Sequence, residues 1–164
     1  MLKKPLIFVT TGTQLPFDRL ITQINNWASK DKQVNVIAQT ANSNGDYHSI
    51  KTVDFLTPSE YDEYTSEATV IVGHAGMGTI ITGFEKNKPL ILMARKFQFG
   101  EHRNDHQQST TSKFDGVKGV YIANDEQELQ ALLSRYDQLE PASDESSPNR
   151  NKLIDYLSTV IENC

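Results

Sequence analysis

The chain has 164 residues, of which 37% are hydrophobic and 23% charged, and its formal net charge is -5. This length suits one globular domain, and the negative charge with scattered basic residues argues against a nucleic-acid surface. Cys164 is the only cysteine, which excludes an internal disulfide and a cysteine-based metal cluster. No apolar run approaches the roughly 18 residues of a membrane-spanning helix. We therefore expect a cytoplasmic protein.

Apolar residues follow two spacings along the chain. Compact β-branched runs, such as residues 5–11, predict buried strands, whereas the apolar residues between Phe17 and Trp27 recur at helical spacing. Thr57 and Pro58 are typical of a helix start. In chain order we predict strand 5–11, helix 17–27, strand 34–38, an edge-like strand 50–56, helix 58–68, strand 69–73, helix 80–85, strand 90–94, helix 109–114, strand 119–123, helix 125–133 and a terminal helix 151–163.

This alternation of strands and helices predicts an α/β fold. All-apolar runs such as residues 90–94 are typical of strands buried on both faces of a parallel sheet. Right-handed crossovers turn the predicted order into one doubly wound, Rossmann-like, mostly parallel sheet. We expect an α/β domain in residues 1–140. Residues 141–164 would form a polar linker and a C-terminal helix that packs on the domain or on a partner.

The stretch from Thr69 to Thr79 joins a predicted strand to a helix through a glycine-rich loop. Glycines let backbone N–H groups approach an anion, and the N-terminus of the following helix favours negative charge. A phosphate would fit at residues 76–79. The loop matches neither the Walker pattern nor the dinucleotide fingerprint, so a tight turn without a ligand remains an alternative. Thr10 to Thr13, after the first strand, provides hydroxyls and a glycine at the same predicted edge of the sheet.

A polar stretch, residues 95–108, follows the strand 90–94. His102 and His106 are four residues apart, which is metal-ligand spacing on a helix, but the zincin motif is absent. The Gly-x-Ser-x-Gly elbow of serine hydrolases is also absent. Asparagine and glutamine both donate and accept hydrogen bonds, so they match sugar hydroxyls. A phosphate-sized loop beside such a stretch suggests a nucleotide-sugar site.

Several segments together resemble the C-terminal, donor-binding domain of GT-B glycosyltransferases of family 28. More closely, the chain is similar to the short subunits that pair with a membrane-anchored partner, such as the catalytic subunit of the dolichol-linked UDP-GlcNAc transferase and its bacterial exopolysaccharide counterparts. The matching segments are Val9 to Thr13, Phe17 to Ile21, Gly73 to Thr79, Lys88 to Ile91 and Asn104 to Gln107.

The resemblance implies a role for each matching residue. It assigns the diphosphate to His74, Gly76, Gly78 and Thr79, and the donor sugar to Asp105, His106 and Gln107. Together with Gly12 and Thr13, these residues form the predicted donor site.

The ribose-binding residue departs from the family pattern. The position of the family's ribose-binding glutamate is held by Thr82, and Glu85 lies one helical turn further on, where it could take over that role or be an ordinary exposed acid.

The resemblance also implies an activity. We expect the donor-binding subunit of an inverting enzyme that moves a sugar from a UDP-sugar to a lipid-linked acceptor. It would need no metal or cofactor, with helix N-termini and Arg95 or Arg103 neutralising the leaving group. A membrane-anchored partner would supply the acceptor half and hold this chain at the membrane. The alternative is a nucleotide-binding regulatory module of the same fold without catalysis.

Overall fold

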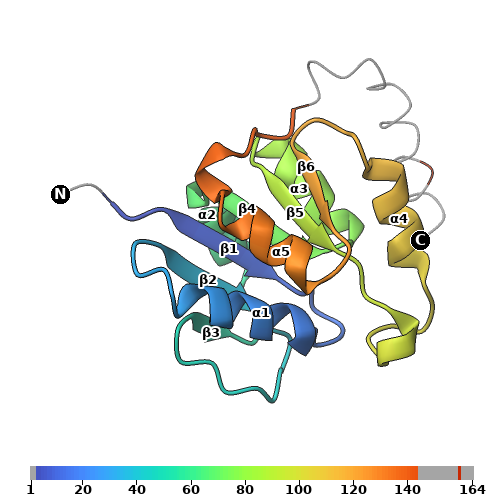
Figure 1. Ribbon diagram of the computed structural model, residues 1–164, viewed down its shortest axis with the longest axis horizontal. Coiled ribbons are helices and arrows are strands. Elements are labelled where there is room, and N and C mark those ends of the chain that lie inside the picture. The colour runs from blue at the N-terminus through green and yellow to red at the C-terminus, as the bar shows by residue number, and fades with distance from the viewer. Residues whose placement is uncertain (1–2, 144–158, 160–164) are drawn as a thin grey trace.

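A six-stranded sheet forms the centre of the protein in the computed structural model, which describes residues 3–143 and Thr159. Every strand pair is parallel, and the strand order is β3-β2-β1-β4-β5-β6 (Figure 1). This order confirms the predicted doubly wound fold. The strands are β1 (Leu6–Thr10), β2 (Asn35–Gln39), β3 (Lys51–Val53), β4 (Val70–His74), β5 (Leu90–Met93) and β6 (Val120–Ala123).

Helices cover both faces of the sheet. In Figure 1, α1 and α5 lie in front of the strands and α2 and α3 lie behind them. The helices are α1 (Asp18–Ala28), α2 (Pro58–Glu67), α3 (Met77–Glu85), α4 (His106–Phe114) and α5 (Glu126–Leu133), with short 3-10 helices η1 (Phe97–Phe99) and η2 (Tyr136–Gln138).

The side chains of β1 divide the apolar core into two clusters. Ile7 and Val9 belong to the cluster under α1 and α5, whereas Phe8 belongs to the cluster that contains Ile80 and Phe114 on the opposite face. All five residues of β1 are buried, as expected for a central strand with helices on both sides. The all-apolar runs in the sequence therefore correspond to strands whose side chains are buried on both faces of the sheet.

Local signals account for the helix starts. The Thr57 hydroxyl accepts from the Glu60 amide at 3.2 Å, and the Glu60 carboxylate accepts from the Thr57 amide at 2.8 Å, which is a complete capping box with Pro58 as the first helical residue. The Asp125 carboxylate caps α5 by accepting from the Glu128 amide at 2.8 Å. In contrast, no side chain caps α3.

The chain remains packed on the domain as far as Ala142. Its side chain is fully buried, and its amide donates to the Lys88 carbonyl at 3.1 Å. Apart from Thr159, the predicted linker and terminal helix beyond residue 143 lie outside the described residues. Within the described part of the chain, no helix is long and apolar enough to span a bilayer.

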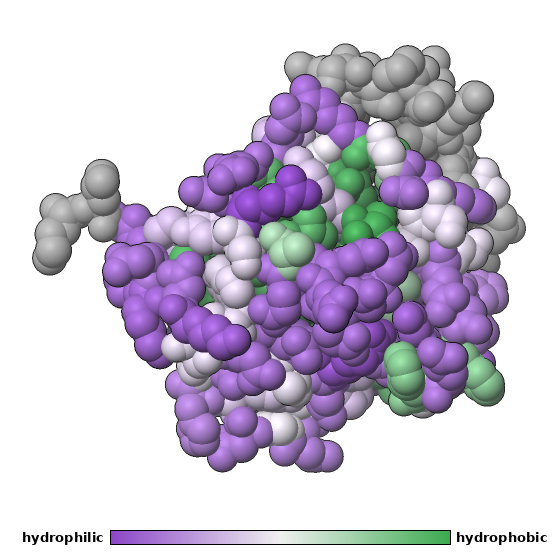
Figure 2. All heavy atoms as spheres, in the orientation of Figure 1, coloured by the Kyte–Doolittle hydropathy of each residue, from purple (hydrophilic) through white to green (hydrophobic). Residues whose placement is uncertain are grey.

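Most of the face shown in Figure 2 is hydrophilic, with a few apolar side chains standing out at the edge where η1 lies. Phe97 and Phe99 of η1 are 60% and 55% exposed. These aromatic residues belong to the polar loop, which we define as residues 95–105.

Candidate functional site

A cleft of about 650 Å³ opens at the carboxyl ends of β1 and β4. These two strands flank the point where the strand order reverses, which is where open parallel sheets bind ligands. The walls come from the first loop (residues 11–17), the glycine loop (residues 73–79), the polar loop, α2 and α3. The described lining residues are Thr10–Leu15, Gln39, Leu56, Pro58, Tyr61, Asp62, Thr65, His74, Gly76–Thr79, Thr82, Glu85, Lys86, Arg95, His102 and Gln107.

The first loop turns sharply at Gly12, whose φ of 78° lies in the left-handed region. The Gly12 amide donates to the Thr10 hydroxyl at 3.1 Å. From β2, the Gln39 side-chain nitrogen donates to the Gly12 carbonyl at 3.0 Å, and the Gln39 carbonyl accepts from the Thr11 amide at 3.1 Å. Gln39 thus fixes the base of this loop. Gln39 was not predicted as a site residue, because its only signal in the sequence is a polar side chain at the end of a strand.

The glycine loop places the N-terminus of α3 at the cleft. The backbone amides of Met77, Gly78 and Thr79 have no hydrogen-bond partner among the described residues, and all three residues line the cleft. A side chain at Gly78 would meet nothing within 4 Å, so this backbone faces open space. Three free amides at a positive helix end are suited to a phosphate group.

His74 lies between the two loops. Added Cβ atoms on Gly76 and Gly12 would lie 2.1 and 3.1 Å from its Nε2 atom, so only glycine fits at Gly76 with the ring in this position. Its Nδ1 atom is buried without a hydrogen-bond partner. Burial, with a smaller contribution from the Arg95 cation, lowers the pKa of His74 from 6.5 to about 4. The imidazole is therefore neutral at physiological pH and has one N–H to donate.

Arg95, one of the two predicted cations, lines the cleft and is held by the first loop. Its side chain is buried, and its guanidinium donates to the carbonyls of Thr11, Leu15 and Pro16 in the first loop. Burial lowers the pKa of Arg95 to about 10, which leaves the group charged. Arg95 lines the cleft, but its terminal N–H groups donate to backbone carbonyls of the protein. The other predicted cation, Arg103, is exposed and does not line the cleft.

Gln107 connects the glycine loop to the polar loop. Its side-chain oxygen accepts from the amides of Ala75 at 3.3 Å and Arg95 at 3.0 Å. Two backbone donors require an oxygen at this position, which fixes the orientation of the side-chain amide. The nitrogen of Gln107 makes no hydrogen bond within the described residues, and Gln107 lines the cleft. Gln107 can therefore only donate to a ligand.

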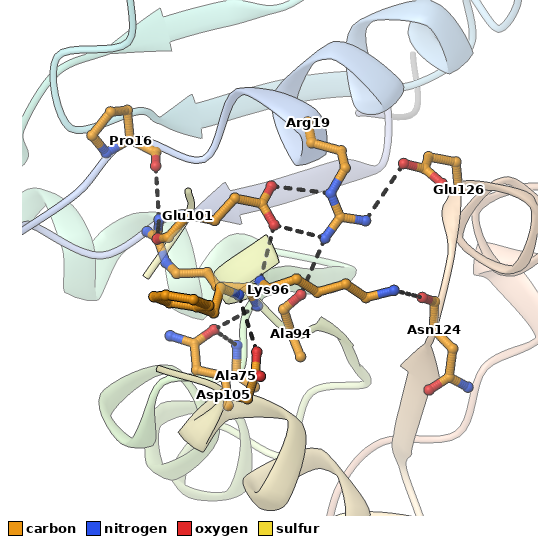
Figure 3. A network of polar contacts seen from close by, with 12 residues as sticks. Pro16, Arg19, Ala75, Ala94, Lys96, Glu101, Asp105, Asn124 and Glu126 are labelled. Atoms are coloured by element: carbon orange, nitrogen blue, oxygen red, sulfur yellow. Dashed lines mark hydrogen bonds and ion pairs between the residues drawn. The ribbon is translucent and has the colours of Figure 1, made fainter. Parts of the chain in front are cut away.

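A partly buried ion pair holds the polar loop against α1 (Figure 3). The Glu101 carboxylate accepts from Arg19 Nε at 3.0 Å and Nη2 at 2.9 Å, and it also accepts from the Lys96 amide at 3.0 Å. The side chains of Arg19 and Glu101 are only 15% and 10% exposed. Burial by itself would lower the pKa of Arg19, but the Glu101 and Glu126 carboxylates more than offset it, so the pKa is raised.

The cleft brings most of the predicted site residues together. Of these, Gly12, Thr13, His74, Gly76, Gly78, Thr79, Glu85 and Gln107 all line it. Asp105 and His106 are exposed and do not. The Asp105 carboxylate instead accepts from the Phe97 amide at 3.0 Å and closes the polar loop.

The expectation that His102 and His106 share a helical face was wrong. The Asn104 side chain accepts from the His106 amide at 3.0 Å, and α4 begins only at His106. His102 lies in the polar loop and lines the cleft, a position that the sequence analysis missed. Among the described residues, no group of histidine, cysteine and acidic side chains is arranged to hold a metal ion.

Glu85 and Thr82 lie on the same side of α3, and both line the cleft. The Thr82 hydroxyl donates to the Gly78 carbonyl at 2.8 Å, whereas Glu85 is exposed and has no partner among the described residues. From α2, Tyr61 and Asp62 also reach the cleft, although the sequence indicated only core packing for Tyr61.

Solved structures with this fold include several glycosyltransferases. The kitacinnamycin glycosyltransferase superposes with a TM-score of 0.63 and 14% identity, over 94% of this chain and 38% of that chain. ALG13 gives a TM-score of 0.59 and 20% identity, over 85% and 89%. MurG from Acinetobacter baumannii gives a TM-score of 0.59 and 14% identity, over 97% and 51%. The chain thus spans about two fifths to one half of the first and third structures, and almost all of ALG13.

No curated protein matches the sequence. The family model for the glycosyltransferase family 28 C-terminal domain matches residues 6–158, which is most of the chain. This match covers the first loop, the glycine loop and the polar loop, the three segments that form the cleft. The chain therefore belongs to the glycosyltransferase family 28 C-terminal domain family.

Proposed function

We propose that this chain is the donor-binding subunit of a glycosyltransferase that uses a UDP-sugar. The observation that carries the proposal is the cleft at the switch point, where three free amides of the α3 N-terminus face open space. Family membership supports a role in glycosyl transfer. The uridine base of the donor and the lipid-linked acceptor are inferred from the resemblance to family 28 enzymes and their short subunits.

In this proposal the donor diphosphate lies on the amides of Met77, Gly78 and Thr79. The neutral His74 ring would donate one hydrogen bond to it without adding a positive charge. Negative charge that develops on the leaving diphosphate would be stabilised by donors that are already in place, which is the condition for effective electrostatic catalysis. No residue of this chain is assigned as the base that deprotonates the acceptor.

The sugar and the ribose would occupy opposite ends of the cleft. The side-chain nitrogen of Gln107 would donate to a sugar hydroxyl or a phosphate oxygen. Glu85 on α3 would accept from the ribose hydroxyls, since Thr82 leaves that face of the helix open. An inverting reaction also needs an acceptor site, which we assign to a membrane-anchored partner. The resemblance to short subunits that pair with a membrane-anchored partner motivates this arrangement, and ALG13, of which this chain covers 89%, shares the fold.

Calorimetric titration with UDP and a panel of UDP- and GDP-sugars tests donor binding. We expect Gly78→Asp to abolish UDP binding, because it places a carboxylate in the open space in front of the free amides. Ser59→Asp is the matched control: Ser59 is the second residue of α2, as Gly78 is of α3, it is exposed, and it does not line the cleft. Unchanged UDP affinity in Gly78→Asp would show that the phosphate is bound elsewhere.

A second candidate function is a nucleotide-binding regulatory module without catalysis. Thr82, in place of the family's glutamate, favours it. Turnover assays with candidate partner chains separate the two functions, because the module would bind UDP-sugars and transfer nothing under any pairing. Sugar transfer by this chain alone at full rate would instead refute the requirement for a partner.

A further inference from the structure

Arg95 is the only charged residue among the fully buried polar side chains of the described chain. Burying an arginine is costly unless its donors are satisfied. Its four terminal N–H groups find four acceptors: Nη1 donates to Pro16 at 2.7 Å and Glu101 at 3.3 Å, and Nη2 donates to Leu15 at 2.6 Å and Thr11 at 2.5 Å. All four acceptors are backbone carbonyls. These four bonds hold the guanidinium group in one position.

Three of these carbonyls belong to the first loop. Thr11 lies at its start and Leu15 and Pro16 near its end, so a single planar group holds both ends of the loop. The guanidinium carbon also lies 5.0 Å from the centre of the Phe17 ring, the last residue of the loop. Between these anchors, Gly12 and Thr13 form a wall of the cleft.

Arg95 is the first residue of the polar loop and is also linked to the glycine loop. Its own amide donates to the Gln107 oxygen, which is shared with Ala75 of the glycine loop. Its guanidinium bond to the Glu101 carbonyl lies within the polar loop, whose position is fixed by the Arg19–Glu101 ion pair. Figure 3 shows this network around Pro16, Ala75 and Glu101. Residues far apart in the sequence therefore converge on Arg95, some through its guanidinium and others through its backbone amide.

The positive charge of Arg95 is not paired directly with a carboxylate. The Glu101 carboxylate is occupied by Arg19 and the Lys96 amide, and only the Glu101 carbonyl faces Arg95. The effect of the Arg95 charge can therefore be measured separately from the effect of the shape of its guanidinium group. A lysine keeps the charge but, as a compact ammonium group, lacks the planar fork that reaches carbonyls at both ends of the loop.

We propose that Arg95 is a positioning residue that assembles the donor cleft by holding the first loop against the glycine loop. It acts through the backbone of residues 11–16 and does not contact the donor. The inference rests on the proposed function, because the cleft that it shapes is the proposed UDP-sugar site. It replaces the expectation that Arg95 neutralises the leaving group directly.

The test compares Arg95→Lys and Arg95→Ala with the matched changes Arg103→Lys and Arg103→Ala. Arg103 is exposed and does not line the cleft, so it controls for net charge. UDP affinity is measured by calorimetry, and hydrogen exchange is measured for peptides that cover residues 11–17 and, as a reference, α5. We expect Arg95→Lys to weaken UDP binding about 10- to 100-fold, because a misplaced loop has effects of this size. Exchange in the first loop should accelerate while exchange in α5 is unchanged.

Guanidinium rescue adds a readout that a general loss of stability would not give. Millimolar guanidinium should partly restore UDP binding to Arg95→Ala, whereas the same concentration of potassium should not. If Arg95→Lys binds UDP as tightly as the parent chain and its first loop exchanges at the same rate, the positioning role is refuted and the charge alone is sufficient. If the parent chain binds no UDP, the proposed function fails, and the exchange rates of the first loop still decide the role of Arg95. If Arg95→Ala does not fold, the Lys variant decides it.

Discussion

Replacing His74 with asparagine should remove part of the pH dependence of folding stability. The pKa of His74 falls from 6.5 to about 4 on folding, so between these values the unfolded chain binds more protons than the folded one. Stability contributed by the neutral ring is therefore complete above pH 6.5 and declines as the pH falls toward 4. For these two pKa values, linkage gives a loss of about 2 kcal/mol between pH 7 and pH 5.

Urea unfolding of the parent chain and of His74→Asn at pH 7 and pH 5 measures how much His74 contributes to the free energy of unfolding at each pH. Other groups titrate equally in both proteins, so the difference between their pH-dependent changes isolates His74. His48→Asn is the control, because this histidine is exposed on the surface. We expect the parent chain to lose about 2 kcal/mol more than His74→Asn over this interval. An equal loss in both proteins would refute the conclusion that His74 is buried in its neutral form.

Three further changes test the packing around the cleft. Thr57→Ala removes the capping box of α2 and should cost about 1 kcal/mol in chemical denaturation, whereas Ser59→Ala should cost little. Glu101→Gln leaves the partly buried Arg19 with Glu126 as its remaining carboxylate partner and should cost about 2 kcal/mol, which Arg19→Met in the same chain should partly recover. Gln107→Glu keeps the oxygen that the Ala75 and Arg95 amides need but removes the donor, so the fold should persist while UDP-sugar affinity falls, as calorimetry would show.

The sequence predicted the sheet well because the physical signals for it are local. Runs such as Leu90–Met93 are apolar at every position, and only a strand buried on both faces requires this. The strand, glycine loop and helix at residues 70–85 were also predicted from neighbouring residues, whereas anion binding by this loop stays a prediction. These predictions depend on near neighbours in the chain, and the structure confirms the fold.

The positions of the Arg95 and His102 side chains could not be predicted from their neighbours in the sequence. Whether a buried arginine faces a ligand or backbone carbonyls depends on where a loop some eighty positions earlier in the chain is placed. The spacing of His102 and His106 suggested that they share a helical face, but α4 begins only at His106, whose amide donates to the Asn104 side chain. The Asn104–Asp105 pair was a local helix-start signal that this prediction overlooked.

The position of β1 has a consequence for synthesis of the chain. One edge of β1 pairs with β2, where Asn35 lies opposite Leu6. The other edge pairs with β4, where Val70 lies opposite Ile7, and it stays unpaired until β4 has been made. At roughly 5–20 residues per second, β4 leaves the ribosome several seconds after β1. During this interval the apolar strand from Leu6 to Val9 has an unpaired edge, which is a template for pairing with other chains. The central strand β1 is thus exposed to pairing with other chains until β4 has been made.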